Sequence, residues 1–163
     1  MNRLLYLIIL LLLANLVATI WFGLDNNQEL QPPNSFNPVK GNLPPVVSDS
    51  IRDNLFADLS NSLNSRDFSA LYQMLGPIAK AQISHESAYE EFEKLTKYFH
   101  SIENGKFSHS EFVRNQEDFE VYNIYYDINL SEKSDFDSSA FLILTIAIKE
   151  NQYQLYGFRI VAG

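Results

Sequence analysis

The sequence contains no cysteine. Without a thiol the chain cannot form a disulfide, hold a thiolate metal site or use a sulfur nucleophile, and it has no N-terminal cysteine to be lipidated. The compartment is not fixed by this absence, because exported domains with an adequate core also fold without disulfides. The lack of cysteine therefore excludes one kind of chemistry and leaves location open.

Positive charge is scarce and dispersed. Twelve Lys and Arg residues stand against 20 Asp and Glu residues, which gives a formal net charge of −8. The basic residues from Lys40 to Arg159 are scattered, and Lys94 and Lys97 lie among carboxylates. Because an acidic field repels a phosphate backbone, we expect no nucleic-acid partner.

Histidine and glycine are also sparse. His85, His100 and His109 have none of the spacings that place two metal ligands on one helical face. His85 lies at the start of a predicted helix and His100 near its end, where a cation can complement the helix dipole, so local structural roles suffice for both. No glycine-rich phosphate loop is present, so we expect no metal and no cofactor.

A long uncharged run lies near the N-terminus, from Leu4 to Leu24. As a helix it would span about 31 Å, close to the hydrocarbon thickness of a bilayer. Arg3 before it and Asp25 after it favour a cytoplasmic N-terminus. We expect a single-pass anchor in a bacterial inner membrane with a periplasmic C-terminal domain. A cleaved signal peptide is the alternative, although Ala14 and Ala18 are four residues apart and fit a small-x-small site poorly.

Residues 25–48 form the next segment, and they contain five of the six prolines among polar residues. Such a composition favours a semi-stiff extended linker. The remainder, residues 49–163, is long enough for one hydrophobic core. The sequence therefore predicts an anchor or uncleaved signal at 1–24, a linker at 25–48 and one domain at 49–163.

Helical spacing of apolar residues appears first in this domain. We expect a helix starting at Ser48 or Asp49, a second over 67–75, a turn or two over 78–83, and a last helix from Ser84 or Ser87 to Gly105. The last helix is expected to be the longest, with a buried face formed by Ala88, Phe92, Leu95, Phe99 and Ile102.

Alternating β-branched and aromatic residues follow Gly105 and predict four strands. Their expected ranges are Phe107–Arg114, Phe119–Leu130, Ala140–Lys149 and Tyr153–Val161. The connections favour an antiparallel meander, with Tyr122 to Leu130 and Leu142 to Ile148 each presenting alternate residues to the core. The fold class is therefore α+β, with three or so helices packed on a curved four-stranded antiparallel sheet.

Three segments carry a family resemblance: Arg66–Tyr72, Gln82–Glu86 and Gln154–Ile160. On these, residues 49–163 resemble the nuclear transport factor 2-like (cystatin-like, cone-shaped α+β) superfamily, in its small exported or membrane-anchored subgroup of unassigned function. The resemblance implies a sheet curved around a cone. Superfamily members include lyases and isomerases with Asp, His and Tyr inside the cone, and non-enzymatic subunits such as single-anchor components of secretion systems. This sequence matches neither group residue by residue.

Four polar residues on two predicted strands are candidates for a site. Asp127 lies in the middle of a strand beside Tyr125, where burial would raise its pKa. Glu111 and His109 share a face of the first strand, as a base and an acid would. The competing interpretation is a solvated outer face, because Tyr125 and Asp127 alternate with the apolar residues of their strand.

Three hypotheses for function follow. The leading one is a non-enzymatic, membrane-anchored extracytoplasmic domain that binds a protein partner or a small apolar ligand on the concave face of the sheet. The first alternative is a small cofactor-free lyase or isomerase, in which Asp127 is the base and a tyrosine donates to the oxyanion. The second is a structural subunit of an envelope or secretion assembly that self-associates, with a homodimer as the simplest form.

Overall fold

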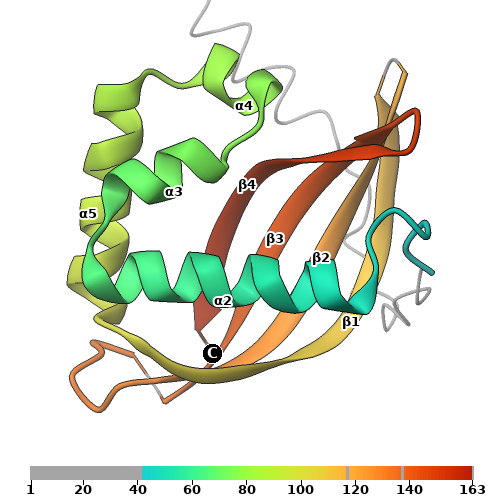
Figure 1. The fold of residues 1–163 in the computed structure, drawn as a ribbon. Helices are drawn as coiled ribbons and strands as arrows, with labels where there is room; N and C mark the ends of the chain where they lie inside the picture. The colour runs from blue at the N-terminus through green and yellow to red at the C-terminus, as the bar shows by residue number, and fades with distance from the viewer. Residues whose placement is uncertain (1–41, 117, 137, 163) are drawn as a thin grey trace, which may run out of the picture. The chain divides into compact units, whose positions relative to one another are not determined.

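The computed structural model describes residues 42–116, 118–136 and 138–162 (Figure 1). The expected anchor at 4–24 and most of the expected linker lie outside these residues. Within the described ranges, no helix combines the length and the apolar character needed to cross a bilayer.

The described part of the chain is α+β, with four helices followed by four antiparallel strands in one open sheet. The helices are α2 (Asp49–Ser65), α3 (Phe68–Met74), α4 (Pro77–Gln82) and α5 (His85–Phe99). The strands are β1 (Ile102–Gln116), β2 (Phe119–Leu130), β3 (Ser139–Lys149) and β4 (Gln152–Ala162). The strand order is β1-β2-β3-β4, which confirms the predicted meander.

The core lies on one face of this sheet. Alternate residues of β2 and β3 are buried as predicted, namely Tyr122, Ile124, Tyr126, Ile128, Leu130, Leu142, Leu144, Ile146 and Ile148. Figure 1 shows α2 crossing the strands on this face, with α3, α4 and α5 on the β4 side. Val47, just before α2, is only 4% exposed, so packing against the core begins ahead of the first described helix.

The predicted last helix was too long. Helix α5 has 15 residues and ends at Phe99, while α2 has 17 and is the longest helix described. The physical reason is His100, whose φ of 57° and ψ of −90° stop the helical hydrogen-bond pattern. Ile102, predicted for the buried face of that helix, instead begins β1 and is buried there.

The start of β1 is held by a side chain of α2. The Asn64 amide donates to the Ile102 carbonyl at 2.8 Å, and the Ile102 N–H donates to Asn64 Oδ1 at 2.8 Å. Gly105 therefore lies inside β1 and does not end a helix. A Cβ at Gly105 would come within 2.4 Å of Phe56 Cζ, so this position accepts only glycine without rearrangement.

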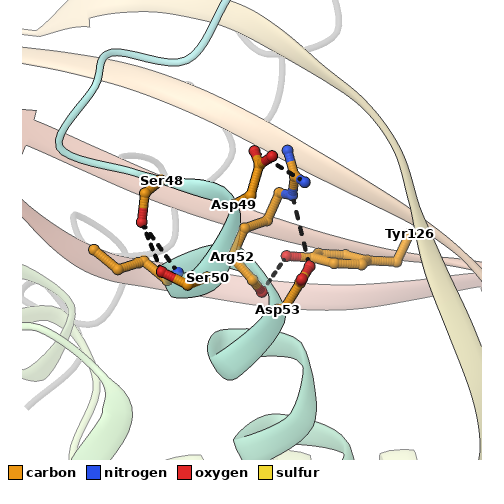
Figure 2. A network of polar contacts seen from close by, with 7 residues as sticks. Ser48, Asp49, Ser50, Arg52, Asp53 and Tyr126 are labelled. Carbon is orange, nitrogen blue, oxygen red and sulfur yellow. Dashed lines mark hydrogen bonds and ion pairs between the residues drawn. The ribbon is translucent and has the colours of Figure 1, made fainter.

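The other end of α2 is fixed to β1 and β2 by polar and aromatic contacts, and Figure 2 shows the polar ones around Arg52. Tyr126 is 1% exposed; its hydroxyl donates to the Arg52 carbonyl at 2.8 Å, and its ring stacks on Phe56 with centroids 4.9 Å apart. The Arg52 guanidinium lies 3.6 Å from the centroid of the Phe107 ring and pairs with Asp49 at 3.2 Å. Burial raises the pKa of the Tyr126 hydroxyl, which therefore remains a donor at neutral pH.

Candidate functional site

The four candidate residues from the sequence lie on the face of the sheet opposite the core. His109 stacks on Tyr125 with ring centroids 4.3 Å apart and an interplanar angle of 8°. The Tyr125 hydroxyl donates to Glu111 Oε2 at 3.0 Å. Asp127, two residues further along β2, alternates with the core residues of that strand and lies opposite Lys106 in the register of β1 with β2. The structure thus brings three of the four into direct contact and places the fourth on the same face.

The contacts in this cluster are those by which two neighbouring strands, β1 and β2, pack their side chains on one another. Burial, and then the bond to Glu111, raise the pKa of Tyr125, while the Arg159 charge opposes the shift. His109 meets Tyr125 through its ring face, and its Nδ1 lies 3.3 Å from Ser108 Oγ. A parallel stack gives no hydrogen bond for proton transfer between the two rings. The contacts therefore hold the outer face together without aligning an acid with a base.

Asp127 and His109 also line separate surface depressions. Asp127 lines one with Lys106 and Asn129, whereas His109 lines another with Arg52 and Phe107. Because Asp127 points away from the core side of the sheet, it cannot serve as a base between the helices and the sheet. The interpretation of these residues as a solvated outer face fits the geometry better than a convergent catalytic set.

A different site lies on the helix side of the sheet, where α4, α5 and β4 enclose a groove of about 440 Å³. We call it the β4 groove. Its lining is mainly apolar, and from the helices and the α3–α4 connection it receives Leu75, Ala79, Ile83, Ala88, Phe92 and Leu95. Strand β4 contributes residues 156–160. Apolar concave sites with few polar groups are the usual form of ligand pockets.

The backbone of β4 forms one wall of this groove. Five consecutive residues of the strand, 156–160, line it. Successive side chains of a strand point to opposite faces, so an unbroken run can reach one groove only through the strand's edge. Phe158 supplies the apolar floor and stacks on Phe92 with centroids 5.5 Å apart and an angle of 17°. The Tyr156 hydroxyl donates to Gln82 Oε1 at 3.0 Å and closes the α4 end.

Helix α5 forms the opposite wall. Ala88 is fully buried, and its small side chain leaves room between the helix and the strand. Leu95 is half-buried and lines the groove, whereas Phe92 on the same helix is buried in the core. Glu91 at the rim accepts a hydrogen bond from Lys94 at 2.6 Å. Arg159 also borders the groove through its place on β4, but its charge acts on Tyr125 on the outer face, so Lys94 is the cation that meets Glu91 at this rim.

Sequence reasoning did not identify the β4 groove. Leu95 was predicted for the buried face of the last helix, and Phe158 was predicted only to lie within the last strand. Helical and strand periodicity report which face of an element is apolar, but they do not report whether a second element fills the space beside it. The one signal available was the crowding of apolar residues on a terminal strand of the meander, which has a neighbour on one side only.

Among the described residues, no group of three or more His, Asp or Glu side chains gathers as metal ligands would. Compared with models of known protein families and with curated proteins, the chain finds no match. The function is therefore argued from the geometry of the β4 groove and from the sequence.

Proposed function

We propose that residues 49–163 form a binding domain that takes an apolar group of a ligand or partner protein in the β4 groove. The main observation behind this proposal is the groove itself, an apolar cavity of about 440 Å³ lined on one side by the edge of β4. Burying one Leu-sized apolar group there would contribute roughly 1.5–3 kcal/mol to binding. We also propose the nuclear transport factor 2-like cone as the fold, supported by helices that cover one face of a four-stranded antiparallel sheet.

The proposal includes the location expected from the sequence. Residues 4–24 would anchor the chain in a bacterial inner membrane, and residues 25–48 would hold the domain on the periplasmic side. A chain lacking residues 1–24 would then leave the membrane fraction and appear in the soluble fraction. Retention of that shortened chain in the membrane would contradict the anchor.

Indole, a small apolar probe, tests the groove directly. The full chain, held in lipid nanodiscs and labelled with ¹⁵N, is titrated with indole, and amide shifts are followed by NMR. We expect shifts at residues 156–160 and along α5. Leu95→Gln should weaken indole binding because it removes apolar lining without emptying the core. Val161→Gln on the outer face is the matched control and should leave the affinity unchanged.

Two outcomes of the indole titration would contradict binding in the β4 groove. The β4 groove is not a binding site if indole shifts the amide signals of outer-face residues as much as those of the groove. The same conclusion follows if Leu95→Gln and Val161→Gln weaken indole binding equally. The lyase alternative is not proposed, because it required Asp127 on the core side of the sheet.

A second candidate function, a self-associating structural subunit, is favoured by a separate observation. Phe141 of β3 and Val161 of β4 are register partners on the outer face, and each is 44% exposed. Buried Ile143 lies next along the same face. Adjacent exposed apolar side chains of this kind favour contact with a second copy. A monomer in sedimentation measurements of the full chain at high concentration would contradict this candidate.

A further inference from the structure

The outer edge of β4 is used only at its beginning. On one side β4 pairs with β3 along its whole length. On the other side Leu75 forms a single parallel bridge with Leu155, and the Gly76 N–H donates to the Leu155 carbonyl at 2.7 Å. Beyond that point, no strand in the described part of the chain pairs with residues 156–162.

The free part of this edge is regular. The only irregularity between β3 and β4 falls between Thr145 and Ile146, at the Tyr156 bulge. After it, Gly157 to Ala162 runs in unbroken register with β3. The other edge strand, β1, carries three irregularities in its pairing with β2. Bulges are a common protection of exposed edges, so β1 is protected along its length whereas β4 is not.

This free edge is also the wall of the β4 groove, since residues 156–160 line it. A ligand in the groove therefore meets a row of backbone donors and acceptors beside an apolar floor. An extended peptide satisfies both, because its backbone can pair with the edge while alternate side chains enter the groove. A compact apolar molecule would fill the floor and leave the backbone groups to water.

Building on the proposed function, we propose that the natural occupant of the β4 groove is an extended, positively charged segment of a partner protein that adds to β4 as a fifth strand. The Leu75 bridge shows that this edge already accepts an extended segment in parallel orientation. Residues 156–162 would pair with a segment of similar length, roughly 23 Å. Glu91 at the rim is already paired with Lys94, so the net charge of −8 sets the sign of the approaching segment.

Hydrogen–deuterium exchange of the full chain in nanodiscs tests the inference, with a capped heptapeptide of alternating lysine and valine as the probe. At a free concentration about nine times its Kd, amides facing the peptide should exchange about tenfold more slowly. The slowing should fall within residues 156–162 and leave β1 unchanged. Leu95→Gln should weaken binding of the peptide about tenfold. Val113→Gln on β1, where the valine is 43% exposed, is the matched control and should leave that binding unchanged.

Two further peptides separate the parts of the inference. A version N-methylated at every residue cannot donate any backbone hydrogen bond and should lose protection; equal protection would overturn strand addition. A heptapeptide of alternating glutamate and valine should bind at least tenfold more weakly, and equal binding would overturn the charge assignment.

The remaining outcomes distinguish this inference from the proposed function. If indole binds but the lysine–valine peptide leaves residues 156–162 unprotected, strand addition is wrong and the groove function stands. If neither binds, both fail. If residues 156–162 become protected without peptide as the protein concentration rises, a second copy occupies the edge and the partner assignment is overturned.

Discussion

Replacing Gly105 by alanine is expected to destabilise the domain, because the new methyl group would lie 2.4 Å from Phe56 Cζ and 2.9 Å from Ile128 Cγ2. Overpacking of a core by a methyl group costs about 1–3 kcal/mol. Alanine in place of a strand glycine stabilises the fold by roughly 0.5–1 kcal/mol, because alanine loses less backbone entropy on folding. The net loss should be about 1.5 kcal/mol, or a Tm about 6 °C lower for a domain of about 120 residues.

Urea unfolding of the full chain, followed by circular dichroism, measures this change. The midpoint should fall with the m-value unchanged, since the same surface is exposed on unfolding. Gly157→Ala is the matched control: a Cβ there meets nothing within 4 Å, so stability should hold or rise by about 0.4–1 kcal/mol. Shortening the facing ring with Phe56→Leu should offset part of the Gly105→Ala loss. If Gly105→Ala is as stable as Gly157→Ala, the packing of α2 on β1 described above is wrong.

Three other perturbations have defined outcomes. Tyr126→Phe removes the hydrogen bond to Arg52 and should cost about 1 kcal/mol in urea unfolding at pH 7. Because burial raises the folded-state pKa of Tyr126, its contribution is complete below the ordinary tyrosine pKa and declines as pH rises above about 10, so Tyr126→Phe should flatten the alkaline loss of stability. Phe141→Lys should shift any dimer seen by sedimentation toward monomer without changing indole affinity; an unchanged dimer would place the contact elsewhere. Gly76→Ala would bring a Cβ within 2.6 Å of Gln154 Cβ, so it should displace α4 and weaken indole binding in the NMR titration, and unchanged binding would show that α4 is not a required wall.

The sheet was predictable because its signal is local and repeated. In β2 the buried residues alternate with less buried ones from Tyr122 to Leu130, and a shift of one residue would turn these apolar side chains away from the core. The end of α5 was not predictable in this way, because Phe99 and Ile102 continue its apolar spacing. What ends the helix is the backbone of His100 at φ 57° together with the Asn64 clamp on Ile102, 38 positions away in the chain. Neither leaves a mark in the spacing of apolar residues.

The candidate site also combines features that local periodicity predicts with features that depend on contacts distant in the chain. Strand alternation placed His109 with Glu111 on one face of their strand and Tyr125 with Asp127 on one face of theirs, but the chemistry of the four depends on contacts across strands. The parallel stack of His109 on Tyr125 follows from the register of β1, which shifts between Phe107 and His109. A bulge of this kind cannot be located from composition, because any residue at an extra position keeps the strand's overall character.

The β4 groove results from how the α3–α4 connection meets the sheet. Gly76 allows that connection to approach β4 closely, and the Gly76 N–H bond to Leu155 fixes it at the beginning of the strand. The Gln154 side chain accepts from the Ile78 N–H at 3.2 Å and fixes the start of α4 beside the beginning of the strand. A connection bound further along β4 would cover its edge and fill the groove. Because backbone pairing with this edge is confined to Leu155, the same glycine that secures the connection leaves the edge of the later part of β4 unpaired and open to a ligand.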